Sequence, residues 1–315
     1  MDVSTRIYIF NGFLDSGKTS FIQETILNTD FCSDEKTVII VSEEGEVEFD
    51  QEEIEARNCD FVYIDDEEEL NYKLLENIKE KYNPTQVIIE LNGMYMINRL
   101  LAASKPEGWE IVQVLTTVNA QTFGLYINNM RSLVYNHIVY SDLVIFNRIN
   151  DNINKLFLRN NVKAINSVVQ IIYEKEDGTV DTLEDIDLPY DVDSSYLDIA
   201  DHDFGIFCMD LRDHPDVYEQ KTVKIRGKFI GLDKQIPNGF IIGREAMVCC
   251  EDDMSLIGMI CVHNAAKQFI PNEWLELEGL IELEYDEDIG SDIAILYVTD
   301  IKVIPPLQQE YVTFD

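Results

Sequence analysis

Residues 6–19 read RIYIFNGFLDSGKT, and this stretch decides the fold of the first half of the chain. A short apolar run ends at Phe10, a turn with two glycines follows, and a helical pattern continues from Lys18 to about Asn28. Residues 12–19 fit the pattern G-x-x-x-x-G-K-[ST] at every defined position. A strand, a glycine-containing turn and a helix in this order predict a phosphate-binding loop at the edge of a parallel sheet.

The residue types in this phosphate loop (residues 12–19) explain how it would bind phosphate. Glycine lets backbone N–H groups turn inward toward an anion, and the N-terminus of the following helix adds a positive partial charge. The Lys18 side chain is expected to reach the β- and γ-phosphates, and the Thr19 hydroxyl is expected to bind magnesium. The predicted nucleotide-binding residues here are Gly12, Asp15, Ser16, Gly17, Lys18, Thr19 and Ser20.

A carboxylate supports the same prediction. Glu90 ends an apolar run that starts at Val87, and it precedes Leu91-Asn92-Gly93. A carboxylate at the carboxyl end of a strand beside a phosphate loop can hold magnesium, directly or through water. We therefore expect Thr19 and Glu90 to be magnesium ligands and Lys18 and Glu90 to be the catalytic residues. The sequence shows no general base, so hydrolysis is expected to be slow and to depend on positioning and charge.

Residues 147–150 read NRIN and follow the apolar run Leu143–Phe146, where GTPases carry N-K-x-D. The aspartate of that motif accepts two hydrogen bonds from guanine, whereas the Asn150 amide offers one acceptor and one donor group. We expect Asn147, Arg148 and Asn150 to face the base of a nucleotide. Three alternatives follow: selectivity for guanine is weakened, Asp151 replaces Asn150, or a 2-keto purine is preferred.

Short β-branched runs alternate with longer helical patterns throughout the first half, as in α/β proteins. This alternation predicts βα units and a mostly parallel sheet with helices on both faces. Residues 176–203 are acidic and weakly periodic, and they are expected to form a linker after a nucleotide-binding domain of residues 1–175.

The pattern changes to period two in the last third of the chain. Residues 204–315 are expected to form a small all-β domain, an OB-like barrel in preference to a sandwich. The five predicted strands are 223–230, 240–248, 256–262, 274–284 and 295–303.

Composition limits the classes of partner. The net charge is −36, and residues 204–315 carry 9 Lys and Arg against 21 Asp and Glu, so nucleic acid is not an expected ligand. No run reaches the roughly 18 apolar residues that a membrane span needs, so no direct membrane insertion is expected. Six scattered cysteines do not suggest a disulfide framework, and a cytoplasmic location is the default expectation.

At these motifs the first half resembles the CobW-like GTPases, relatives of the hydrogenase and urease nickel-insertion GTPases. The resemblance covers about residues 5–175 and rests on the phosphate loop, on the E-x-x-G of residues 90–93 and on Ser141-Asp142 leading to Asn147. It implies GTP and magnesium as cofactors, a metallochaperone or regulatory role, and nucleotide-dependent homodimers. The segment Glu43–Glu46 resembles the family's switch region, where its carboxylates would meet magnesium or water, or be solvated.

The family usually carries a C-x-C-C metal motif between the second and third strands. This sequence has only Cys59 there, and one thiolate does not make that site. The second half contains Gly227 with Phe229-Ile230, Gly258, and the stretches FIIGR at 240–244, VCCEDD at 248–253 and WLELEG at 274–279. On these residues it resembles, over about residues 204–310, the soluble domain of YcgQ-like proteins, which accompany a predicted membrane permease.

A thiolate-containing zinc site is one interpretation of Cys249, Cys250 and His263. Adjacent residues on a strand point to opposite faces, so both thiolates would need a bulge or turn to share one ion. The alternative interpretation is that one cysteine lies in the core and the other at a strand end.

Two functional hypotheses follow. The first is a CobW-like NTPase, with GTP or another nucleoside triphosphate as substrate, that acts in metal handling or transport-associated regulation and serves a metalloprotein client or a permease. The second is a non-catalytic adaptor for a membrane permease that has lost the family's GTPase and metal motifs.

Overall fold

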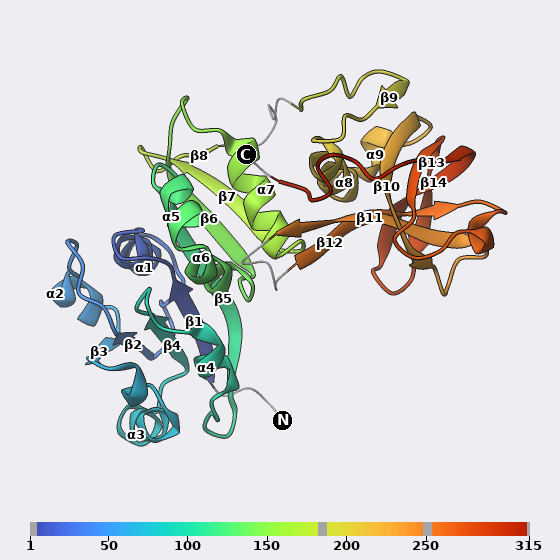
Figure 1. Ribbon diagram of the computed structural model, residues 1–315. Helices are drawn as coiled ribbons and strands as arrows, with labels where there is room; N and C mark the ends of the chain where they lie inside the picture. The colour runs from blue at the N-terminus through green and yellow to red at the C-terminus, as the bar shows by residue number, and fades with distance from the viewer. Residues whose placement is uncertain (1–4, 182–187, 248–253, 314–315) are drawn as a thin grey trace. The chain divides into compact units, whose positions relative to one another are not determined.

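The computed structural model describes residues 5–181, 188–247 and 254–313, and it contains two compact units (Figure 1). The first unit comprises residues 1–153 and 168–183, and the second comprises residues 154–167 and 184–315. Helix α7 (Lys155–Ile165) therefore belongs to the second unit, although it lies between two strands of the first unit in sequence. The domain limits drawn from the sequence stay a prediction.

The first unit is built on an eight-stranded sheet of order β3-β2-β4-β1-β5-β6-β7-β8. Only β7 and β8 pair antiparallel, so the predicted mostly parallel sheet is confirmed. The strands are β1 (Thr5–Asn11), β2 (Thr37–Val41), β3 (Cys59–Tyr63), β4 (Gln86–Glu90), β5 (Trp109–Asn119), β6 (Leu143–Ile149), β7 (Gln170–Lys175) and β8 (Val180–Asp181).

Helices cover both faces of this sheet. Alternate residues of β1, β2 and β4 point to opposite faces, because successive side chains of a strand do so. One face packs on α3 (Tyr72–Tyr82) and α4 (Ile97–Ala102), and the other packs on α1 (Lys18–Asn28) and α2 (Gln51–Glu55). The remaining helices of this unit are η1 (Glu67–Glu69), α5 (Phe123–Asn129) and α6 (Arg131–Ile138).

The register of the central strands places three chain segments side by side. Phe10 pairs with Glu90, and Glu90 also pairs with Val41, so β1, β4 and β2 all end in one row. Ligands of parallel α/β sheets bind outside the carboxyl ends of the strands. The residues that follow β1 and β2, together with the last residue of β4, are therefore brought to one edge.

The second unit contains a closed five-stranded barrel, which confirms the predicted small all-β domain. Its strands follow the order β10-β11-β12-β14-β13, and β10 pairs with both β11 and β13. The strands are β10 (Thr222–Leu232), β11 (Gly239–Met247), β12 (Met254–Val262), β13 (Trp274–Asp286) and β14 (Ser291–Val303). The short strand β9 (Tyr196–Asp198) adds to β10, and η2 (Ala266–Gln268) follows β12.

Two helices that the sequence patterns did not predict precede the barrel: α8 (Phe204–Asp213) and α9 (Pro215–Tyr218). A buried ionic cluster joins α8 to α7. The Arg159 guanidinium is 2% exposed, and it lies 2.5 Å from a carboxylate oxygen of Asp213 and 3.6 Å from one of Asp210. Asp210 also accepts a hydrogen bond from the Tyr218 hydroxyl at 2.7 Å. This cluster fixes α7, α8 and α9 together inside the second unit.

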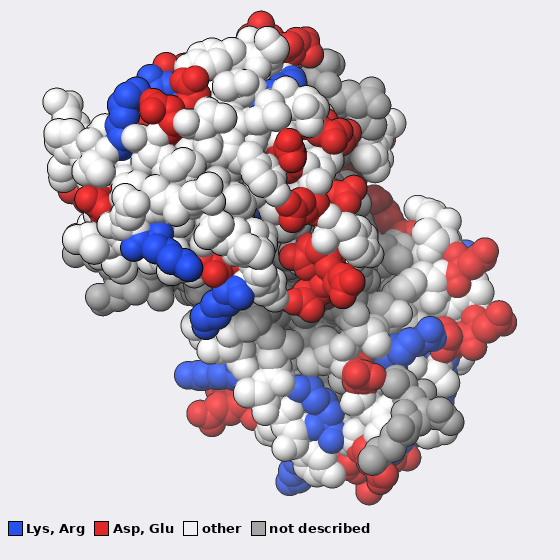
Figure 2. All heavy atoms as spheres, turned by 90° about the vertical axis from the view of Figure 1, so that its right-hand side faces the viewer, with Lys and Arg blue, Asp and Glu red and all other residues white. Residues whose placement is uncertain are grey.

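Acidic side chains are prominent on the molecular surface. On the face shown in Figure 2, Asp and Glu form a broad patch, whereas Lys and Arg are spread in small groups. This distribution agrees with the net charge of −36. Among the described residues, no helix is long and apolar enough to cross a membrane.

The ionic cluster of α7 and α8 generates a stability prediction. Arg159→Ala leaves the Asp210 and Asp213 carboxylates without their guanidinium in a poorly solvated place, and we expect a loss of about 3 to 5 kcal/mol of unfolding free energy. Urea unfolding in a Trp109→Phe background measures this loss, because Trp274 of β13 is then the one tryptophan left. Arg212→Ala removes an exposed arginine from α8 and should cost less than about 1 kcal/mol. Equal losses in the two variants would contradict the assigned role of the cluster.

Candidate nucleotide-binding site

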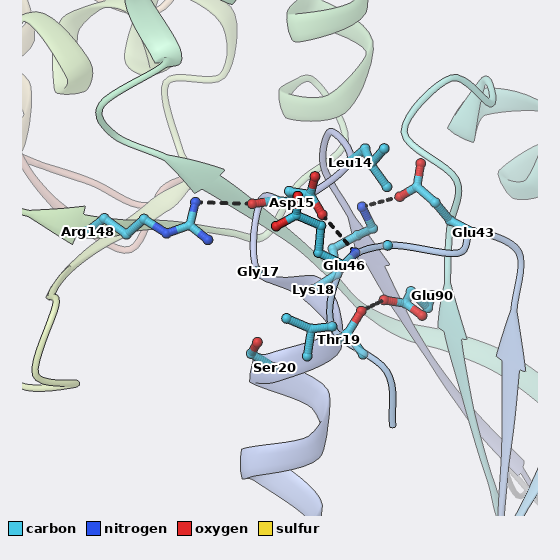
Figure 3. A pocket seen from close by; sticks show the side chains of 12 residues that line it. Leu14, Asp15, Gly17, Lys18, Thr19, Ser20, Glu43, Glu46, Glu90 and Arg148 are labelled. Atoms are coloured by element: carbon cyan, nitrogen blue, oxygen red, sulfur yellow. Dashed lines mark hydrogen bonds and ion pairs between the residues drawn. The ribbon is translucent and has the colours of Figure 1, made fainter. Parts of the chain in front are cut away.

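The phosphate loop connects β1 to α1, and close packing explains its glycines. Gly17 has φ 97°, and a Cβ atom there would lie 2.6 Å from Asn147 Nδ2. No side chain fits at that distance, and the left-handed backbone also favours glycine. The loop residues Asp15, Gly17, Lys18, Thr19 and Ser20 line one pocket together with residues that follow β2, with Glu90 and with Arg148 (Figure 3).

Lys18 lies at the bottom of this pocket and is 3% exposed. Its ammonium group donates to the backbone carbonyls of Gly12 and Phe13, both at 2.9 Å. Its third contact is a carboxylate oxygen of Glu43 at 2.6 Å (Figure 3). An ammonium group has three hydrogens, so these three acceptors use every donor that Lys18 has.

Thr19 and Glu90 are brought together, as two ligands of one ion would be. The Thr19 hydroxyl donates to Glu90 Oε1 at 2.5 Å. Burial raises the pKa of Glu90, whereas the Thr19 hydrogen bond and the Lys18 charge lower it. A hydroxyl and a carboxylate are the hard oxygen donors that magnesium prefers, so these residues fit the ion.

The base loop, residues 147–150, makes contacts of two kinds. Asn147 donates through Nδ2 to the Ser16 carbonyl at 2.7 Å, and Arg148 donates to the Asp15 carbonyl at 3.1 Å. Both side chains thus support the phosphate loop, and Asn147 Oδ1 is a buried atom with no hydrogen-bond partner among the described residues. Asn150 instead accepts a hydrogen bond from the Asn152 N–H at 3.0 Å, within its own turn.

Glu43 is the site residue that the sequence analysis did not assign to Lys18. It is the second residue after β2, and its Oε1 atom accepts a hydrogen bond from the Gly93 N–H at 3.3 Å. Its position after a buried strand that neighbours β4 was the available signal. That signal did not distinguish contact with magnesium or water from contact with the lysine.

His137, on α6, contacts the backbone of Gly93 beside the site. Its ring is buried, and Nε2 lies 2.8 Å from the Gly93 carbonyl oxygen. Burial lowers the pKa of His137 to about 4, and the nearby Lys18 charge lowers it too. The neutral ring can donate from Nε2, so His137 holds the carbonyl of Gly93, the residue whose N–H faces Glu43.

The suggested zinc residues are not brought together in the described part of the chain. Cys249 and Cys250 lie outside the described residues, and His263 Nδ1 accepts a hydrogen bond from the Ala265 N–H at 3.1 Å. The described residues contain no group of three or more His, Cys, Asp or Glu side chains arranged to hold a metal ion.

These observations define a P-loop nucleotide-binding protein: a phosphate loop after the first strand of a parallel sheet, with a carboxylate from the adjacent strand beside its threonine. The chain belongs to the CobW/HypB/UreG family, because the sequence profile of that family's nucleotide-binding domain matches residues 6–173. A second profile, the DUF1980 C-terminal domain, matches residues 179–313. Both parts of the predicted resemblance are thereby confirmed at the level of these families. No curated protein matches the chain.

Solved structures of GTPases are similar to parts of this chain. The zinc-bound YjiA GTPase from E. coli is 14% identical, with a TM-score of 0.43, over 88% of this chain and 86% of that one. The hydrogenase maturation factor HypB from Archaeoglobus fulgidus is 15% identical, with a TM-score of 0.39, over 55% of this chain and 82% of that one.

The burial of His137 predicts a pH dependence of stability. The unfolded chain binds a proton at a histidine pKa of about 6.5, whereas the folded protein does so only near pH 4, so unfolding free energy falls as the pH drops from 6.5. Between pH 6.5 and pH 5 this contribution is about 2 kcal/mol.

Urea titrations at pH 5 to 7 measure the effect. His137→Gln retains an N–H donor but cannot titrate, so its stability should decline less steeply with acid than that of the parent. His202→Gln, which changes an exposed histidine, should follow the parent. Identical pH profiles for the parent and His137→Gln would show that the ring is not held neutral.

Proposed function

We propose that this protein is a magnesium-dependent GTPase with slow intrinsic hydrolysis, whose nucleotide state regulates metal handling or a transport-associated process. One observation carries the proposal: the Lys18 ammonium, the Thr19 hydroxyl and the Glu90 carboxylate converge in one pocket at the carboxyl edge of the sheet. Membership of a family of GTPases supports the reaction class. In this proposal Gly12, Asp15, Ser16, Gly17, Lys18 and Ser20 bind the phosphates, and the base loop faces the base.

The mechanism that we propose depends on charge and position. Magnesium, when bound by Thr19 and Glu90, supplies positive charge that offsets the negative charge of the phosphates. Lys18 supplies a second positive charge, and the backbone of the phosphate loop orients the phosphates. Among the described residues of the pocket, the Glu43 carboxylate is engaged by Lys18 and the Glu90 carboxylate by Thr19. This supports slow turnover or completion of the site by a partner.

The second unit supports a coupling role in this proposal. Its barrel has the strand order and the parallel β12–β14 pairing of an OB-type barrel, and we assign it to that type. In this proposal a permease or a metalloprotein client docks on the barrel. The protein is cytoplasmic and forms homodimers when it binds nucleotide. The permease adaptor without hydrolysis is the second candidate, and the Asn150 side chain, which is occupied by its own turn, favours it.

Calorimetric titration with GTP, ATP and XTP, each with magnesium, tests the proposal. We expect micromolar affinity for a purine triphosphate and a loss of at least 100-fold in Lys18→Ala, because no other ammonium group lines the pocket among the described residues. Lys81→Ala removes the same charge from α3, where its described hydrogen bond goes to the Tyr82 hydroxyl, and should bind like the parent.

The outcomes separate the two candidates. Phosphate release above the Lys18→Ala background identifies the GTPase, whereas binding without release identifies the adaptor. No binding of any of the three nucleotides would reject nucleotide binding by the isolated chain. A preference for XTP over GTP would assign the base contact to the Asn150 amide, which can donate to a 2-keto group.

Glu90→Gln tests the magnesium ligand. The amide carries no charge, so we expect magnesium to improve triphosphate binding in the parent far more than in the variant, whereas affinities in EDTA stay similar. Because burial raises the pKa of Glu90, the parent's magnesium effect should be present at pH 8 and decline with acid before an ordinary glutamate would protonate. A magnesium effect of the same size in Glu90→Gln would remove Glu90 from the ligand set.

A further inference from the structure

In the phosphate loop, the negative charge that lies against Lys18 comes from a side chain of the same protein, Glu43. Lys18 has all three donors engaged, and Glu43 provides the one acceptor that is not part of the loop backbone. The Gly12 and Phe13 carbonyls belong to the loop and stay with it when a ligand enters. A phosphate that is to occupy the position between Lys18 and the Gly93 N–H must therefore replace the Glu43 carboxylate.

Glu43 also uses a second donor beside the loop. Its Oε2 atom contacts Lys18 at 2.6 Å, and its Oε1 atom accepts from the Gly93 N–H at 3.3 Å. Gly93 packs directly on the loop, because a Cβ atom there would lie 2.5 Å from the Gly12 carbonyl oxygen. One anionic group thus bridges a lysine ammonium and a backbone N–H, which are the donor types that bind phosphate oxygens.

The residues that follow Glu43 extend this contact over the loop. The Glu46 N–H donates to Asp15 Oδ1 at 3.3 Å, and a Cβ atom on Gly45 would lie 3.3 Å from the same oxygen. Glu43, Gly45, Glu46 and Val47 line the same pocket as the phosphate loop, and Figure 3 shows Glu43 and Glu46 there. Residues 43–47 are here called the lid segment, and the Glu44 side chain does not line the pocket. Movement of Glu43 away from Lys18 therefore involves the lid segment.

Because this position is buried, an anion must always lie against Lys18, so Glu43 can leave only when another anion replaces it. The side chains of Lys18 and Glu43 are 3% and 10% exposed, so water does not replace either partner easily. A buried ammonium left without an anion is strongly unfavourable. The pocket thus holds either the carboxylate or a phosphate against Lys18 and Gly93, and the two anions compete.

We propose that the Glu43 carboxylate occupies the position of the terminal phosphate of a nucleoside triphosphate, and that Glu43 thereby determines how strongly the protein discriminates triphosphate from diphosphate. This inference rests on the proposed nucleotide binding. A diphosphate has no group for the position between Lys18 and Gly93, so Glu43 and the lid segment keep their contacts. A triphosphate displaces Glu43, and the lid segment loses its contact with Asp15.

Nucleotide affinities of Glu43→Gln test the inference. Glutamine keeps the length and an oxygen acceptor but removes the competing charge, so we expect triphosphate affinity to rise at least 10-fold and diphosphate affinity to change less than 3-fold. The probes are GDP and a non-hydrolysable GTP analogue, each with magnesium. Glu44→Gln removes the same charge from an exposed neighbour and should keep the parent's ratio of the two affinities.

Hydrogen exchange of the parent provides a second readout that does not depend on the folding of a variant. The peptide that contains residues 43–47 should exchange faster in the triphosphate complex than in the diphosphate complex, because the Glu46 N–H loses Asp15.

Binding of both nucleotides with an unchanged ratio in Glu43→Gln, or equal exchange in the two complexes, overturns this inference and leaves the proposed function intact. Binding of neither nucleotide by the parent or by Glu43→Gln overturns both. Triphosphate binding that appears only in Glu43→Gln supports the inference in its strongest form.

Discussion

The buried ammonium group of Lys18 is the constraint on which the arrangement of the site depends. A charge that is 3% exposed is tolerated only when its donors are all used and an opposite charge lies nearby. Two acceptors come from the loop itself, but the counter-charge comes from Glu43, the second residue after β2. Since β4 lies between β1 and β2, the loop obtains that counter-charge only when three strands end in one row. The phosphate loop therefore depends on the register of the sheet, because that register brings the counter-charge to Lys18.

The features that were predictable from the sequence are those encoded by neighbouring residues. The strand before Gly12 and the helix from Lys18 follow from hydrophobic period and glycine spacing, and so do the parallel sheet and the five barrel strands. Within the site, the pairing of Thr19 with Glu90 was also predictable. The end of a strand and the neighbouring phosphate loop lie at the same edge of a parallel sheet. Each of these features followed from signals within single segments, and the general geometry of parallel sheets related the segments to each other.

The features that were missed depend on contacts between distant segments. Glu43 reaches Lys18, and His137 reaches Gly93, only through the register of the sheet and the packing of α6. A carboxylate and a histidine look the same in sequence whether solvated or buried. Helix α8 was missed for another reason: with Phe204, Phe207, Cys208, Met209 and Leu211 buried, it lacks the polar face that makes a helical period visible.

Asp15 joins the two ends of the site. Its backbone carbonyl accepts from Arg148 of the base loop, and its carboxylate accepts from the Glu46 N–H of the lid segment. Asn147 adds a bond from the base loop to the Ser16 carbonyl, so the base loop and the phosphate loop are connected at consecutive residues. A displacement of the lid segment therefore breaks a contact of the residue that also holds Arg148. A departure from N-K-x-D at the base end therefore affects the support of the phosphate loop as well as the choice of base, because Arg148 holds the Asp15 carbonyl.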